Sequence, residues 1–152
     1  MLHHIKPWLA SFPWPAVVQL NRDHCQTKGL THTLVPDRAD QARGLWEGCA
    51  ARPLPLSEAV DLCRRCHDLT PFTFGSASTF VAIAHALIEE LAQRLPPVEA
   101  QVLRNTVGHY VAGLISRKEL ERVFRHFNPR WGAGRAAPST AAVVAAAQQL
   151  VS

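Results

Sequence analysis

Residues 78–95 read STFVAIAHALIEELAQRL, the clearest amphipathic element of the chain. Its apolar residues recur at spacings of three and four, which predicts a helix with one broad apolar face. That face consists of Phe80, Ala84, Leu87, Ile88, Leu91 and Leu95. The nearly unbroken apolar run from residue 80 to 88 is far shorter than the ~20 residues that cross a bilayer. We therefore expect a core helix and no membrane partner.

Two further helices are expected before this element, over residues 37–50 and 57–69. Asp37 can cap the first helix, and the prolines that follow residue 50 stop it. Ser57 and Glu58 open the second helix. Both contain apolar residues at helical spacing, so each is predicted to turn one face to the core.

Two helices are expected after it, over residues 98–115 and 116–127. Pro97 suits the first turn of the first of them. Ser116 and Glu119 match a capping box, which predicts where the second begins. The helix over residues 98–115 has two apolar sides, so we expect other helices to pack on both of them. The main side consists of Leu103, Val107, Tyr110, Val111 and Leu114, and the smaller side of Val98 and Val102.

The ends of the chain differ from this helical pattern. In residues 1–35, Pro7, Pro13 and Pro15 favour an extended or turn conformation, so we predict an arm that packs on the helices. Asn128-Pro129 is expected to close the regular part. Residues 132–152 are predicted to form a flexible Gly/Ala/Pro join and a marginal alanine-rich helix.

Length and composition fit a single domain. The chain has 152 residues, of which 47% are apolar and 18% charged, enough to build a real core. The predicted fold is therefore an all-α, single-domain bundle of five or six helices with a proline-rich N-terminal arm. Residues 1–131 form the helical domain.

Charge and cysteine usage indicate the compartment. Prolines interrupt the apolar N-terminal run, and no small-residue cleavage site follows it, so no export signal is expected. Four cysteines without such a signal are most simply reduced thiols in a cytosol, which predicts a cytoplasmic protein. The net charge of +4 permits an acidic partner without requiring one.

The segment Cys63-Arg64-Arg65-Cys66-His67 carries the main chemical hypothesis. On a helix that advances about 100° per residue, Cys66 lies about 60° to one side of Cys63 and His67 about 40° to the other. Such soft ligands favour zinc, but a structural zinc site needs four. The predicted metal ligands are Cys25, Cys63, Cys66 and His67, with His24 or Cys49 as substitutes.

Other interpretations of the same cluster stay open. Cys49, Cys63 and Cys66 can be small buried core residues with no ligand. Alternatively, Cys63 and Cys66 can form a redox pair, since the two arginines between them favour a thiolate. Cys-x-x-Cys-His is also the attachment sequence for c-type haem, which is less favoured without an export signal.

Two further features are weaker. His85 with Glu89, and His109, are more simply explained as surface or packed residues than as catalysts. The C-terminal part is basic and could contact nucleic acid through Arg117, Lys118, Arg122, Arg125 and Arg130.

The sequence therefore predicts a small cytoplasmic, non-enzymatic binding or regulatory protein that has a protein partner and is stabilised by a Cys/His zinc site. The alternatives are a thiol-dependent redox enzyme that uses Cys63 and Cys66, and a nucleic-acid-binding protein. No catalytic residue is assigned.

Overall fold

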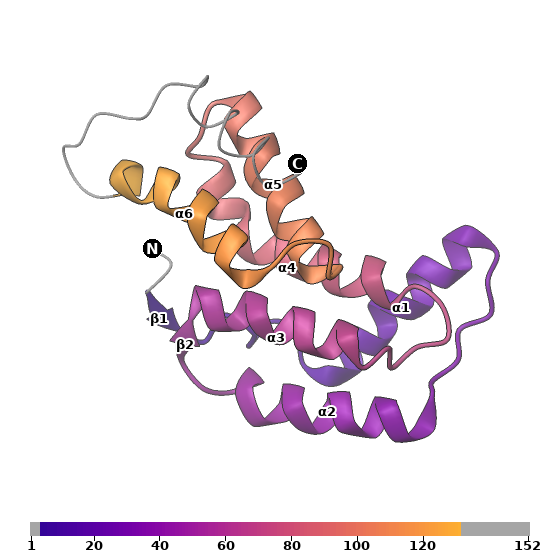
Figure 1. Cartoon of the computed structure of the whole chain (residues 1–152). Helices are drawn as coiled ribbons and strands as arrows, with labels where there is room; N and C mark the ends of the chain where they lie inside the picture. Colours follow the sequence, from indigo (N-terminus) through magenta and orange to yellow (C-terminus); the bar gives the residue numbers. More distant parts are fainter. Residues whose placement is uncertain (1–3, 132–152) are drawn as a thin grey trace.

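Six α-helices and a small two-stranded sheet make up the part of the chain that the computed structural model describes, residues 4–131, with side chains over 4–127 (Figure 1). The prediction of an all-α bundle is confirmed. The join and alanine-rich helix predicted for residues 132–152 lie outside the described residues.

The helices follow one another with short connections. They are α1 (Trp14–Lys28), α2 (Pro36–Ala50), α3 (Leu56–Asp68), α4 (Ser76–Ala92), α5 (Pro97–Val111) and α6 (Arg117–Trp131). The strands β1 (Ile5–Lys6) and β2 (Leu54–Pro55) pair antiparallel, with Ile5 opposite Pro55 and Lys6 opposite Leu54. The sheet attaches the N-terminal segment to the start of α3.

Helix α4 is the centre of the core. It packs against α3, α5 and α1 (Figure 1), so its apolar residues are covered from several sides. The six residues predicted for its apolar face are all buried. The side chains of Trp46 and Phe72 extend this core toward the N-terminal third of the chain, because both rings pack against Phe80.

The arm prediction was wrong for residues 14–28, which form α1. Pro13 precedes the helix and Pro15 lies in its first turn, where a missing backbone donor costs nothing because that N–H has no partner within the helix. The helix ends at Gly29, which has a left-handed backbone with φ of 69°. Before the helix, the Phe12 carbonyl accepts a 2.7 Å hydrogen bond from Trp46 Nε1.

Helix α5 ends earlier than predicted. Gly113 has a φ of +81°. Its N–H donates to the carbonyl of Tyr110, and the N–H of Leu114 donates to the carbonyl of His109. This is the hydrogen-bond pattern of a Schellman motif, which ends the helix before Leu114. Leu114 is consequently 71% exposed, and the prediction that it faces the core was wrong. Val98, predicted to lie on a second contact face, is 54% exposed.

Helix α6 begins as predicted. The Ser116 hydroxyl accepts from the Glu119 N–H at 3.2 Å, and the Glu119 carboxylate accepts from the Ser116 N–H at 2.7 Å. This reciprocal pair is a capping box. The helix continues to Trp131, so the prediction that Asn128-Pro129 closes it was wrong. Among the helices within residues 4–131, none combines the length and apolar character that a membrane crossing requires.

Candidate functional site

The two cysteines of α3 face the core. Cys63 and Cys66 are both fully buried, and the Cys66 thiol lies 3.7 Å from the carbonyl oxygen of Ala42 in α2. Burial raises the pKa of the Cys66 thiol to about 12, and burial next to Cys66 raises the pKa of Cys63 as well. Both thiols are therefore protonated at neutral pH, whereas metal ligation and disulfide exchange use the thiolate.

The other predicted zinc ligands lie elsewhere. Cys25, buried in α1, has its sulfur 3.7 Å from the carbonyl of Phe74 and 3.7 Å from the Asn21 side chain. His24 packs on Gly75, where an added Cβ would meet its ring carbon Cδ2 at 2.6 Å. His67 lies toward Asp68, with 3.6 Å between Nδ1 and the carboxylate.

These side chains do not assemble into a ligand set. Within residues 4–127, the structure brings together no group of three or more His, Cys, Asp or Glu side chains that could hold a metal ion. All four cysteines are free thiols. The zinc site stays a prediction, and the core interpretation of Cys63 and Cys66 agrees with their burial.

Cys49 differs from the other three cysteines. It is partly exposed at the end of α2, and its sulfur accepts a 3.5 Å hydrogen bond from Nη2 of Arg52. This contact raises the pKa of the Arg52 guanidinium. Cys49 and Arg52 both line a feature of the surface that gathers several charged side chains.

That feature is a pocket of about 320 Å³ between the end of α2, α3 and the start of α6. Leu54 and Leu62, both buried, contribute its apolar lining. The polar and charged lining comes from Cys49, Arg52, Glu58, Asp61, Arg65 and Arg117. We call it the arginine pocket.

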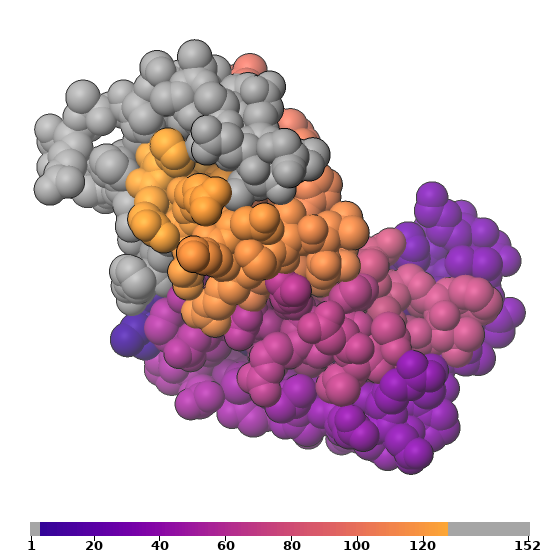
Figure 2. Space-filling view, viewed as in Figure 1, coloured from indigo at the N-terminus to yellow at the C-terminus, as the bar shows by residue number. Residues whose placement is uncertain are grey.

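Helical spacing explains the α3 wall of the arginine pocket. Asp61 and Leu62 each lie three or four positions from both Glu58 and Arg65, so these four residues share one side of α3. On the face of the molecule shown in Figure 2, α6 (orange) lies directly above α3 (magenta). Arg117, the first residue of α6, reaches Asp61 across this boundary, with 3.4 Å between Nη1 and the carboxylate.

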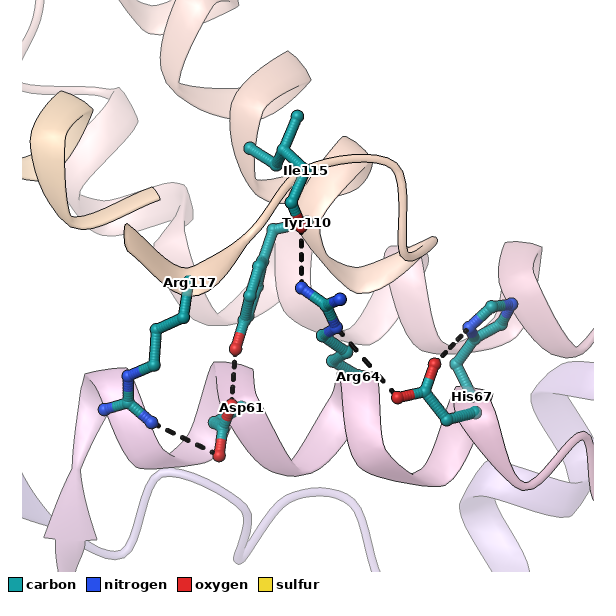
Figure 3. A network of polar contacts seen from close by, with 7 residues as sticks. Asp61, Arg64, His67, Tyr110, Ile115 and Arg117 are labelled. Carbon is teal, nitrogen blue, oxygen red and sulfur yellow. Dashed lines mark hydrogen bonds and ion pairs between the residues drawn. The ribbon is translucent and has the colours of Figure 1, made fainter. Parts of the chain in front are cut away.

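A network of polar contacts holds the start of α6 in place (Figure 3). Asp61 accepts a hydrogen bond from the hydroxyl of Tyr110 in α5 while it pairs with Arg117. Arg64 donates to the carbonyl of Ile115 at 2.7 Å, and its guanidinium lies over the Tyr110 ring, 4.6 Å from the centroid. Burial and the neighbouring Asp61 carboxylate raise the pKa of Tyr110. Asp61 of α3, itself hydrogen-bonded to Tyr110 of α5, therefore holds Arg117 in the pocket.

The residues that line the arginine pocket carry one more positive than negative charge, and the neighbouring Glu121 carboxylate offsets it. Three guanidinium groups, from Arg52, Arg65 and Arg117, face two carboxylates, from Glu58 and Asp61. Arg117 also bonds to Glu121 at 3.2 Å, and this contact together with Asp61 raises the pKa of its guanidinium. The arrangement can hold an anion, because guanidinium groups donate hydrogen bonds in a fork that matches carboxylate and phosphate oxygens.

Other predicted candidates have structural partners. His85 bonds through Nε2 to the Arg104 carbonyl at 2.9 Å, and Glu89 makes a two-bond pair with the Arg104 guanidinium at 2.7 and 3.2 Å. These contacts join α4 to α5 without forming an acid-base pair. His109 is exposed near the end of α5.

The predicted basic residues of α6 divide into two groups. Arg117 belongs to the arginine pocket. Lys118, Arg122 and Arg125 are exposed and recur at helical spacing, so they share a solvent-facing side of α6. Arg130 belongs to the backbone of the same helix.

Sequence reasoning missed the arginine pocket: it assigned no role to Arg52 and considered Arg65 only as a neighbour of the cysteines. The spacing of Glu58, Asp61 and Arg65 was the available signal. Comparison with protein-family models, curated proteins and solved structures finds no match to this chain. The function is therefore inferred from the geometry of the site.

Proposed function

We propose that this protein is a non-enzymatic, cytoplasmic binding protein with a regulatory role, and that its binding site for an anionic ligand is the arginine pocket. The observation that supports this most strongly is the meeting of Arg52, Arg65 and Arg117 in one pocket. Each comes from a different segment of the chain, and together they present guanidinium donors on several sides of one small pocket, where a multiply charged anion can receive hydrogen bonds from more than one of them.

The thiols support binding over catalysis. Both residues of the Cys-x-x-Cys pair are buried with raised pKa values, which is unfavourable for a redox enzyme. Four free cysteines also agree with a reducing compartment. The anion can belong to a small molecule or to an acidic side chain of a protein partner.

Calorimetric titration of the full chain with citrate and with pyrophosphate, at constant ionic strength, tests the proposal. Arg65→Gln removes one guanidinium from the pocket, and Arg94→Gln is the matched control, since Arg94 is an exposed arginine of the α4–α5 connection that pairs with Glu90. We expect Arg65→Gln to weaken binding of at least one anion about tenfold, the loss of one charge-assisted hydrogen bond. Equal affinity in both variants would contradict the proposal.

Nucleic-acid binding is a second candidate. The observation in its favour is the exposed side of α6 formed by Lys118, Arg122 and Arg125. If this side binds phosphate backbones, affinity for a duplex will fall steeply with salt. That salt dependence should weaken in the double variant Arg122→Gln, Arg125→Gln, and an unchanged slope would remove this candidate.

A further inference from the structure

We infer that the arginine pocket selects a phosphomonoester group over a carboxylate. This inference rests on the proposed function and narrows it to one chemical class of ligand. It follows from what already occupies the guanidinium groups of the pocket, from the size of the pocket and from the charge that each kind of anion carries.

Two of the three guanidinium groups of the pocket, those of Arg52 and Arg117, already have partners. Arg117 pairs with the carboxylates of Asp61, at 3.4 Å, and Glu121, at 3.2 Å. Arg52 donates to the Cys49 sulfur and is influenced by the charge of Glu58. At Arg117, a ligand carboxylate would exchange one singly charged partner for another of the same kind, so it gains little there. A phosphomonoester carries about −1.5 to −2 charges at pH 7 and competes more strongly for the same donors.

The number of donors points in the same direction. A carboxylate has two oxygens in one plane, which a single guanidinium fork satisfies. A phosphomonoester has three terminal oxygens, each a strong acceptor. Donors that come from the turn after α2, from α3 and from the start of α6 suit a group with acceptors in three directions.

The pocket also limits the ligand to a small one. Its volume of about 320 Å³ lies at the low end of the roughly 300–1,000 Å³ of small-molecule sites. The lining by Leu54 and Leu62 is aliphatic. The fitting ligand is thus a phosphate on a short aliphatic carrier, either a free metabolite or a phosphorylated serine side chain.

A matched pair of probes separates the two chemistries. Glycerol 3-phosphate and glycerate each have three carbon atoms and two free hydroxyl groups, and they differ in whether the third carbon carries a phosphate ester or is itself the carboxylate. Calorimetric titration of the full chain at pH 7.5 should show at least tenfold tighter binding of glycerol 3-phosphate. A phosphoserine-containing tetrapeptide is titrated in parallel to identify the source of the phosphate. Tighter binding of the peptide indicates a phosphorylated protein partner, and tighter binding of glycerol 3-phosphate indicates a free metabolite.

The pH dependence supplies a second readout. Because the second pKa of a phosphomonoester is near 6, its dianion fraction rises about fourfold between pH 5.5 and 7.5, and its affinity should rise with it. The charged and titratable groups that face a ligand here are Cys49, Arg52, Glu58, Asp61, Arg65 and Arg117. Glycerate contacts the same protein groups. The ratio of the affinities for glycerol 3-phosphate and glycerate at each pH therefore removes the effect of titrating those protein groups.

The reactivity of Cys49 shows whether a probe binds in the arginine pocket. It lines the pocket and is the partly exposed cysteine, whereas Cys25, Cys63 and Cys66 are buried. Saturating glycerol 3-phosphate should slow alkylation of Cys49 by iodoacetamide at least threefold, and Arg65→Gln should abolish this protection at the same probe concentration.

The outcomes separate the inference from the proposed function. If glycerate binds as tightly as glycerol 3-phosphate and Arg65→Gln weakens both, the pocket binds anions and the phosphate inference is overturned. If no probe binds in an Arg65-dependent manner, both fail. Tighter, Arg65-dependent binding of a phosphate probe that protects Cys49 supports both.

Discussion

Gly75 occupies a backbone conformation that any other residue would strain. Its φ is +76°, and an added Cβ would lie 2.6 Å from Cδ2 of His24. It precedes α4, the central helix, so the strain would act at the junction of α1 and α4. At the scale of single residues, Gly75 is therefore a position where a side chain is costly.

We expect Gly75→Ala to lower the free energy of unfolding by at least about 1–2 kcal/mol, the cost of a side chain in the left-handed region. Gly44→Ala is the control, because Gly44 lies inside α2 with open space around it. Alanine there should raise stability by about 0.5–1 kcal/mol. Urea denaturation of both variants checks this, and equal effects at the two positions would contradict it.

Because of Tyr110, the free energy of unfolding should decrease as the pH rises in the alkaline range. Burial and the Asp61 carboxylate raise the pKa of Tyr110 in the folded state. A tyrosine in the unfolded chain ionises at pH ~10. Above that pH, the folded chain therefore retains a proton that the unfolded chain loses. The stabilisation is complete below that pH and is lost as pH rises above it.

Tyr110→Phe should therefore lower the free energy of unfolding by about 1 kcal/mol at neutral pH, because the hydrogen bond to Asp61 is lost. Above pH 10, the variant should lose less of its stability than the unchanged protein does. Urea denaturation at several pH values measures both effects. Cys63 and Cys66 titrate in both proteins, so the difference between the two curves isolates Tyr110. Parallel curves above pH 10 would disprove the assignment.

At the scale of elements, local signals explain most of the fold. The stripe from Phe80 to Leu95 and the capping box at Ser116 act within a helix or at its end, so periodicity and spacing were sufficient to find α2 to α6. Helix α1 was missed because Pro13 and Pro15 look like helix breakers in sequence, although the first turn accepts them. Leu114 was misplaced because the left-handed Gly113 ends the helix, so that α5 stops at Val111, four residues before the predicted end at residue 115.

The candidate site was harder to predict than the helices. Cys63, Cys66 and His67 lie close together in sequence, but α3 turns both thiols into the core. The arginine pocket depends instead on Arg52 and Arg117, which are 65 positions apart and meet only when α6 packs above α3. Such a pairing is set by tertiary packing and leaves no local pattern.

The capping box at the start of α6 gives a prediction for that helix. Ser116→Ala should lower stability by about 1 kcal/mol, since the N–H of Glu119 loses its acceptor. Ser57→Ala is the control, because α3 starts at Leu56 without a side-chain cap, and we expect a change of at most about 0.5 kcal/mol. Thermal unfolding compares the two variants, and equal losses would show that the box does not stabilise α6.

At the scale of the whole molecule, the bundle divides the cysteines into one partly exposed thiol and three buried ones. In native protein, iodoacetamide should modify Cys49 alone, and all four cysteines should react after denaturation. Mass spectrometry of digested protein measures each rate. Native-state reaction of Cys63 or Cys66 at the rate of Cys49 would contradict their burial and favour the redox alternative.

The central claim is that the packing of α2, α3 and α6 creates an anion site. The most direct test is a titration of ¹⁵N-labelled full-length protein with citrate and, separately, pyrophosphate, followed through the backbone amide signals at constant ionic strength. We predict saturable shifts confined to residues 49–54, 58–65 and 115–121 for at least one of the anions. Shifts that fall mainly outside these three segments, or that do not saturate with either anion, would contradict the claim.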